Sequence, residues 1–329
     1  MKNIFKFLKK GKIANPPWDY DFLVNLEKSE YPRYLSKLFK IRTEEELPLL
    51  KEWNFKKWTS INPCGQKLWN YIIDKNRCKT FNQKIQWIKL YGITPLMRDC
   101  TDKVKVRDFV REKIGDEYLK PVLQICNSFD EIDWDKLSNS FVIKCNHGCK
   151  WHYIIKNKEE YLKNKRLVEI TRRNITGWLE QDYSLLNGFE LNYRGIEPKI
   201  LIEPLLRDSI NKDSQTINVY CFNGYPEIII KFYGNGAMSI FNKKLKHEEN
   251  IFNFLEKNII TNIDDLVNQS FDLSEKLSKD FLFVRVDWII YRNKLYFEEL
   301  TFTPYSGFNP FIDKERNLEL GKLIKIERL

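Results

Sequence analysis

The chain has 329 residues, of which 43% are hydrophobic and 14% aromatic, a composition typical of a folded globular protein and not of a disordered one. The formal net charge is +10, but lysines and arginines are spread along the whole chain without a nucleic-acid-binding signature, so we expect no nucleic-acid partner. No stretch approaches the roughly 20 unbroken apolar residues that a membrane helix needs.

The N-terminal region, residues 1–78, is expected to be helical and interrupted by prolines. Ile4, Phe5 and Leu8 lie among lysines, which favours a short basic amphipathic helix over a signal peptide. Such a helix could dock on the body of the protein, on another enzyme of its pathway, or on a membrane surface. Seven cysteines without a disulfide-like spacing indicate a cytoplasmic protein, with the inner face of the membrane as an alternative place for the N-terminus.

The remaining elements follow from capping signals and periodicity. Thr80 and Gln83 are spaced as in a capping box before a helix, and a second amphipathic helix is expected over 103–114, ending at Gly115. A further helix is expected over 159–183. The other expected elements are strands at 141–145, 151–156, 200–206, 217–222, 227–232, 284–291 and 295–301 and a helix at 264–280. The pattern predicts an α+β protein with mostly antiparallel hairpins.

The last hairpin carries the side chains with the clearest chemical meaning. Arg285 and Asp287 are two residues apart on one strand, and Glu299 and Thr301 are two apart on the next, so each pair shares a face. Magnesium prefers oxygen ligands and usually takes one or two carboxylates plus substrate phosphates, and a guanidinium can bind phosphate oxygens. The hairpin therefore predicts a metal–phosphate site, with an exposed cross-strand ion pair as the alternative.

Cys145, His147, Cys149 and His152 form a compact C-x-H-x-C-x-x-H run. Alternate residues of an extended strand point in parallel, whereas a tetrahedral zinc site draws its ligands from separate elements. We therefore interpret these groups as reduced thiols and hydrogen-bonded histidines, with histidines acting as bases near a phosphate as the alternative.

The Arg-x-Asp strand followed by a Glu-x-Thr strand resembles the metal-binding strands of ATP-grasp ligases. The resemblance implies that Arg285 contacts the transferring phosphate and that Asp287, Glu299 and Thr301 bind magnesium. It also implies nucleotide contacts from residues in the matching order upstream. These are Lys103 and Arg107 at the opening segment, Lys144 at the end of a strand, His147, Gly148 and Lys150 in the loop that follows, and Glu203, Leu205 and Leu206 at the hinge beside the adenine.

More narrowly, the chain is similar to the TupA-like subgroup of ATP-grasp proteins, which occurs with enzymes of bacterial capsule, teichuronopeptide and O-antigen synthesis. The segments that carry the similarity lie at 79–96, 102–123, 141–148, 275–287 and 296–308. They imply an ATP-grasp region over 79–329, with an inserted ATP-binding subdomain at about 120–208 and antiparallel sheets that cradle the nucleotide.

Three functions remain open on this basis. The first is an amide ligase that uses ATP and Mg²⁺ to join a sugar carboxylate, such as a uronic acid, to an amine or amino acid through an acyl phosphate. The second is a glycosyltransferase-like enzyme of the same pathway that uses a nucleotide sugar. The third is a non-catalytic glycan-binding module that uses some of the 9 tryptophans and 16 tyrosines to stack on sugars.

Overall fold

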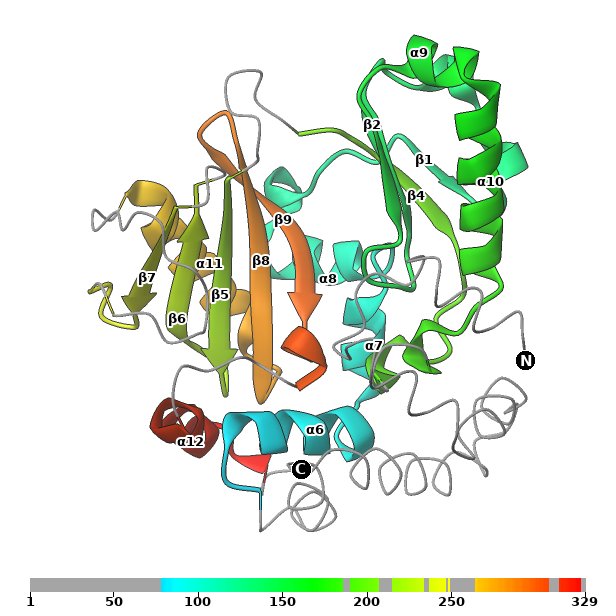
Figure 1. Ribbon diagram of the computed structural model, residues 1–329. Helices are drawn as coiled ribbons and strands as arrows, with labels where there is room; N and C mark the ends of the chain where they lie inside the picture. Colours follow the sequence, from blue (N-terminus) through cyan, green and yellow to red (C-terminus); the bar gives the residue numbers. More distant parts are fainter. Residues whose placement is uncertain are drawn as a thin grey trace, which may run out of the picture.

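The computed structural model describes residues 78–185, 190–206, 215–233, 237–246, 248, 264–307 and 314–326. Within these ranges the chain is α+β, as expected, and its strands form two antiparallel sheets that stand side by side with helices around them (Figure 1). The expected N-terminal helices, and the docking or membrane contact considered for them, lie outside the described residues.

Three helices lead into the sheets. Helix α6 (Phe81–Tyr91) begins with the expected capping box, because Thr80 Oγ1 accepts the backbone N–H of Gln83 and Gln83 Oε1 accepts that of Thr80. Helix α7 (Pro95–Thr101) has proline at its first position, and α8 (Val106–Ile114) ends at Gly115, whose φ of 100° is easily adopted only by glycine.

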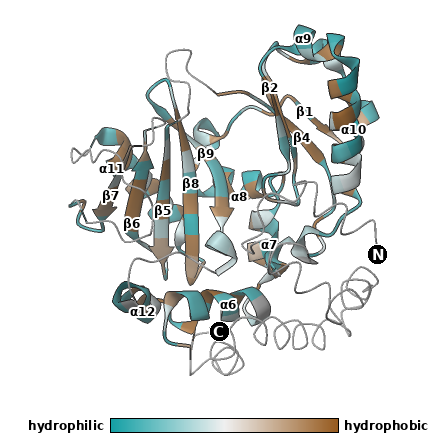
Figure 2. Ribbon diagram, in the orientation of Figure 1, coloured by the Kyte–Doolittle hydropathy of each residue, from teal (hydrophilic) through white to brown (hydrophobic). Residues whose placement is uncertain are grey.

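The smaller sheet has the strand order β1-β4-β2-β3. Its strands are β1 (Gln124–Cys126), β2 (Phe141–Cys145), β3 (His152–Ile155) and β4 (Ile200–Pro204). Helices α9 (Lys158–Lys163) and α10 (Lys165–Leu179) cover one face, where Phe141, Ile143 and Ile202 pack in a core with Ile175 of α10. Figure 2 shows the apolar strands of this sheet and the mixed apolar and polar surface of α10. The opposite face of the sheet is consequently left to polar side chains such as Lys144 and Glu203.

The larger sheet has the order β7-β6-β5-β8-β9. Its strands are β5 (Gln215–Phe222), β6 (Tyr225–Phe232), β7 (Met238–Asn242), β8 (Phe283–Tyr291) and β9 (Lys294–Thr301). Helix α11 (Asp265–Ser278) packs across β5, β6 and β8, and the fully buried Trp288 of β8 donates a hydrogen bond to Ser274 of this helix. Strands β7 and β9 are the two edges of this sheet, and Figure 1 shows β9 on the side of the smaller sheet.

Helix α12 (Lys314–Leu323) lies against α6 below the larger sheet (Figure 1). A Cβ at Gly321 would come within 2.1 Å of the Lys79 carbonyl oxygen, so glycine permits this close approach. Single 3₁₀ turns occur at Asp116–Tyr118, Phe129–Glu131, Trp134–Lys136, Tyr183–Leu185 and Leu191–Tyr193, whereas Pro304–Gly307 forms a turn in which Tyr305 and Ser306 have left-handed φ angles of 51° and 52°. None of the described helices is both long enough and apolar enough to cross a membrane.

Several boundaries differ from those expected from the sequence, and two of the differences have a clear local cause. Helix α8 starts three residues late because Asp102 Oδ1 accepts the backbone N–H of Val104 at 2.8 Å and holds a turn before the helix. The helix expected over 159–183 is divided at Asn164, which has a non-helical ψ of 78° and caps α10 by accepting the N–H of Leu167. In both places a short polar side chain competes with the helical hydrogen bonds of the backbone.

Candidate functional site

The β8–β9 hairpin brings Arg285, Asp287, Glu299 and Thr301 together on one face, as the sequence predicts. Arg285 lies opposite Thr301, and Asp287 opposite Glu299. The Arg285 guanidinium donates to both carboxylate oxygens of Asp287, at 2.7 and 2.6 Å, and lies 3.9 Å from Glu299. Thr301 Oγ1 lies 3.1 Å from an oxygen of each carboxylate. The hairpin therefore presents a compact group of oxygen donors held by one arginine.

Burial controls the ionisation of this group. Asp287 is only 7% exposed, and burial raises its pKa to about 6 although the Arg285 cation opposes the rise. Burial alone would lower the pKa of Arg285, but the attraction and hydrogen bonds of Asp287 outweigh it and the pKa is raised. Both groups are consequently charged at neutral pH.

The donor set of the hairpin fits magnesium. Its ligand atoms are carboxylate and hydroxyl oxygens, the hard donors that Mg²⁺ prefers. In the part of the chain that the structure describes, no group of three His, Cys, Asp or Glu side chains is placed to hold a metal by itself. The hairpin thus suits an ion that takes its remaining ligands from phosphate oxygens and water.

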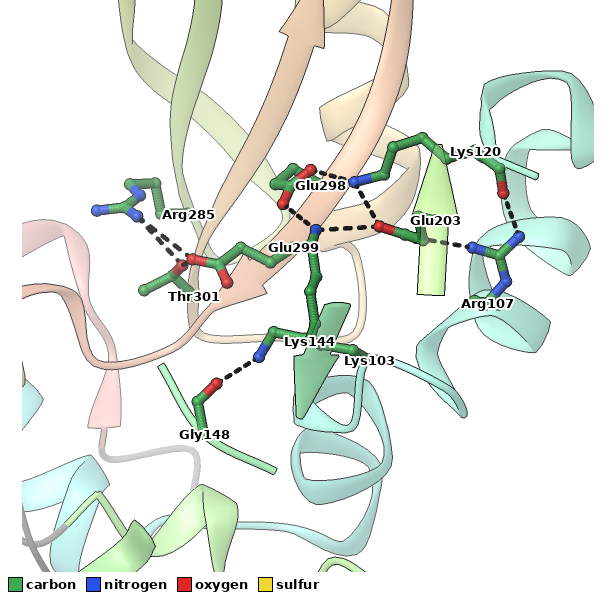
Figure 3. Close-up of polar contacts among 10 residues, drawn as sticks. All are labelled: Lys103, Arg107, Lys120, Lys144, Gly148, Glu203, Arg285, Glu298, Glu299 and Thr301. Atoms are coloured by element: carbon green, nitrogen blue, oxygen red, sulfur yellow. Dashed lines mark hydrogen bonds and ion pairs between the residues drawn. The ribbon is translucent and has the colours of Figure 1, made fainter. Parts of the chain in front are cut away.

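A β-bulge in β9 aims a further carboxylate toward the smaller sheet. Asp287 pairs with Glu299 while the next residue, Trp288, pairs with Phe297, so Glu298 is an extra residue without a partner in the register. Bulges of this kind re-aim side chains and are frequent next to active sites. The Glu298 carboxylate contacts the ammonium groups of Lys120 and Lys144, the latter at 2.7 Å (Figure 3).

These contacts belong to an ion-pair network between the sheets. Glu203 of β4 lies 3.0 Å from the ammonium groups of both Lys120 and Lys144 and 3.4 Å from the Arg107 guanidinium (Figure 3). Burial alone would raise the pKa of each carboxylate, but the lysines outweigh it and hold the pKa of Glu203 and of Glu298 below the ordinary value. The network therefore places three cations around two ionised carboxylates.

The loop after β2 is fixed by buried polar and aromatic contacts. Asn146, which is 0% exposed, donates to Asp102 and to the Glu197 carbonyl and accepts the backbone N–H of Lys199 at 2.7 Å. Lys103 donates to the Gly148 carbonyl at 2.7 Å. A Cβ on Gly148 would come within 2.3 Å of the Trp151 ring, so this single glycine makes room for the indole.

Four further residues were predicted to contact the nucleotide, and they have different surroundings. Both ring nitrogens of His147 are engaged, by Asn146 Oδ1 at 3.2 Å and by the Trp178 carbonyl at 3.0 Å, and burial lowers its pKa. Lys150 is exposed and has a left-handed φ of 60°. Leu205 and Leu206 follow β4 and are half-buried. These positions, unlike Lys103, Arg107, Lys144 and Glu203, do not join the polar contacts of Figure 3.

Lys103, Arg107, Lys144, Glu203 and Glu298 line a small cavity between the sheets, together with Val106, Leu201 and Phe297. The cavity has a volume of about 10 Å³, which is room for roughly one water molecule. The cations in its lining are complementary in charge to the phosphates of a nucleotide. A nucleotide would enter the cavity only if side chains of the network moved apart.

The family description TupA-like ATP-grasp matches residues 83–325, well over half of the chain. The chain belongs to this family. Its two antiparallel sheets and flanking helices accordingly form an ATP-grasp fold. No curated protein matches the chain.

Solved ligase structures resemble the TupA-like chain over part of its length. D-alanine–D-alanine ligase from Bacillus anthracis, complexed with ATP, is 16% identical, with 61% of this chain and 53% of that chain covered and a TM-score of 0.36. The Helicobacter pylori enzyme is 14% identical, with 74% and 69% covered and a TM-score of 0.40. L-amino acid ligase from Bacillus licheniformis is 12% identical, with 67% and 47% covered and a TM-score of 0.40. The match thus spans about half the length of the two Bacillus enzymes.

Lys120 and Glu298 join the site of this TupA-like protein without a motif that marks them. The buried residues Leu295, Phe297, Leu300 and Phe302 are spaced two, three and two apart, and the three-residue step is the one sequence sign of the bulge. Continued from Leu295 and Phe297, a strict period of two would instead place Glu299 on the core face.

Proposed function

We propose that this chain is an ATP- and Mg²⁺-dependent carboxylate–amine ligase that forms an amide through an acyl phosphate. Family membership supports the nucleotide-dependent chemistry in general. The observation that carries the proposal is the arrangement of two charged groups on neighbouring sheets, with the oxygen donors of the β8–β9 hairpin on one side and the cations around Glu203 on the other (Figure 3).

In this proposal the smaller sheet and α8 hold the nucleotide. Lys144 and Arg107 supply positive charge for the phosphates, and Lys103 fixes the following loop through the Gly148 carbonyl. Lys150 adds a cation at the exposed end of that loop. Glu203, with Leu205 and Leu206 after it, would form the hinge beside the adenine, since these residues end the strand that lies next to β2.

The hairpin would hold the metal and stabilise charge. Asp287, Glu299 and Thr301 would provide oxygen ligands for Mg²⁺, and Arg285, held by Asp287, would face the negative charge that develops on the phosphoryl group. Bound there, ATP would supply the phosphoryl group that activates the carboxylate, with ADP as the leaving group, and Mg²⁺ would neutralise charge on the phosphates. The chain's own part is to position groups and stabilise charge, which this class of reaction requires more than a nucleophilic side chain.

The finer assignment rests on the family resemblance alone. We propose a uronic acid or similar acidic sugar as the carboxylate and an amino acid or other small amine as its partner. The proposed setting is the synthesis of a bacterial surface polysaccharide in the cytoplasm. These choices are testable with a panel of uronic acids and amines offered to the full chain together with ATP and Mg²⁺.

The decisive experiment measures ATP-dependent phosphate release with that panel. Arg285→Ala, Asp287→Ala and Glu299→Ala should each abolish release, with a loss of at least about 10² in rate, because each removes a group aimed at charge in the transition state. Arg292→Ala, in the exposed turn of the same hairpin, is the matched control and should leave the rate unchanged.

A second readout separates binding from catalysis. Mg²⁺ and ATP should raise the melting temperature of the wild-type chain, because a ligand that binds only the native state stabilises it. Full turnover by any of the three hairpin variants would refute the assignment. A melting temperature raised by nucleotide sugars and not by ATP would replace the ligase with a sugar transferase.

A further inference from the structure

Glu298 lies where the phosphate-binding cations of the proposed site converge. The bulge in β9 takes it out of the strand register, and β9 is an edge strand of the larger sheet. Its carboxylate contacts Lys120, which precedes β1, and Lys144 of β2, so one side chain of the larger sheet is shared between two lysines.

The charge balance of the network depends on this residue. Arg107, Lys120 and Lys144 are the cations, Glu203 and Glu298 the carboxylates, so the network has a net charge of +1. The neighbouring Glu203 belongs to the same sheet as Lys144 and holds it in register from the adjacent strand. Glu298 is the carboxylate that comes from the opposite sheet, and it offers the lysines what a phosphate would offer, two anionic oxygens.

The size of the cavity also indicates that Glu298 has to move before a polyphosphate can bind. The cavity lined by Arg107, Lys144, Glu203 and Glu298 has a volume of about 10 Å³, so a polyphosphate can reach these cations only if side chains of the lining, such as that of Glu298, move away. A change of side-chain rotamer could move the Glu298 carboxylate away, because its backbone lies in a bulge at a sheet edge, and this change would break its contacts with Lys120 and Lys144. Its side chain is 27% exposed, so solvent is available to hydrate the carboxylate once it leaves the lysines.

We propose that Glu298 is a specificity-determining residue that occupies the phosphate position and yields it only to a ligand with several negative charges. Binding of a polyphosphate then exchanges one anion for another at Lys120 and Lys144. A nucleoside monophosphate offers fewer anionic oxygens and displaces Glu298 poorly. This inference rests on the proposed function in that the same cations are assigned to the nucleotide.

Glu298→Gln tests the inference because it keeps the size of the side chain and removes its charge. Isothermal titration of the full chain with ATP and Mg²⁺, inorganic tripolyphosphate and AMP gives the three affinities. We expect Glu298→Gln to bind ATP and tripolyphosphate at least about tenfold more tightly than wild type, because a unit negative charge a few ångströms from the ligand is removed. The affinity for AMP should rise by a smaller factor. Glu319→Gln, which removes a carboxylate from an exposed ion pair on α12, is the matched control and should not change the affinities.

Glu298→Asp provides a second variant if the glutamine protein does not fold, and its shorter side chain should give a smaller gain. Unchanged or weaker polyphosphate binding in the Glu298 variants, with ATP still bound by wild type, would overturn the inference and leave the proposed function standing. Tighter binding of tripolyphosphate without any binding of ATP would support the role of Glu298 and overturn the nucleotide site. Binding of neither ligand by any variant or by wild type would overturn both.

Discussion

Glu203 is the residue on which the stability of the network should depend most. Its carboxylate is 5% exposed at the side chain and lies 3.0 Å from Lys120, 3.0 Å from Lys144 and 3.4 Å from Arg107. Glu203→Gln keeps the volume but turns one acceptor oxygen into a donor that faces cations. Separate charged hydrogen bonds are each worth about 1.5–3 kcal/mol. Because Glu298 still contacts both lysines, we expect less than the sum of these contributions, a loss of about 3–5 kcal/mol in the free energy of unfolding, as for breaking a buried ion pair.

The pH dependence of that loss identifies its cause. The pKa of Glu203 is lowered in the folded chain, so its contribution to stability is complete above the unfolded-state pKa of about 4.3 and disappears as the pH falls through the folded-state value. Urea unfolding of wild type and Glu203→Gln at pH 7 and at decreasing pH should give curves that converge in acid. Glu112→Gln, on the exposed surface of α8, is the control and should change stability by less than about 0.5 kcal/mol. A loss below about 1 kcal/mol at pH 7, or one that persists unchanged in acid, would refute the described network.

Two further predictions concern the loop after β2. Gly148→Ala should destabilise the chain by about 1–3 kcal/mol, because its Cβ would overlap the Trp151 ring. Gly177→Ala, at a position in α10 with open space around it, is the control and should be neutral or stabilising. Equal melting temperatures of the two variants would contradict this prediction. Burial lowers the pKa of His147, so the unfolded chain binds its proton first and stability should fall below about pH 6.5 by up to about 1.4 kcal/mol per pH unit. Urea unfolding of His147→Gln should show a shallower fall, and identical pH profiles would exclude His147 as the source.

The side chains that share a face within each strand of the metal hairpin could be predicted, because alternation along a strand is a local property. Side chains of a strand alternate, and a turn as short as Arg292-Asn293 fixes the register of its two strands. These rules place Arg285 with Asp287 and Glu299 with Thr301. The register set by the turn alone would bring Asp287 opposite Glu298, and the bulge shifts it by one residue, so that Arg285 meets Thr301 and Asp287 meets Glu299. The β5–β6 hairpin was predictable for the same reason, with its turn at Asn223-Gly224.

The shortest elements could not be predicted from periodicity. Strand β1 has three residues, too few for an alternating pattern to stand out from chance, and β7 is buried at four successive positions and so does not alternate. Helix α7 has seven residues and is recognisable chiefly by Thr94 and Pro95 at its start. Such elements form because neighbouring strands and helices offer them partners.

The ion-pair network depends on how the two sheets face each other. Glu298 and Lys120 are 178 residues apart in the sequence, and no local pattern indicates that they meet. The sequence could reveal that each is charged, and the spacing of the apolar residues in β9 could reveal a bulge. Their contact is a property of the tertiary structure.

The aromatic side chains behind the loop have an optical consequence. The indoles of Trp151 and Trp178 are stacked with ring centroids 6.0 Å apart and planes only 4° from parallel. Two chromophores in this arrangement couple their ultraviolet transitions, and the coupling weakens steeply as they separate. The chain thus contains an intrinsic spectroscopic reporter in which circular dichroism would register any shift of the loop against α10, without a label.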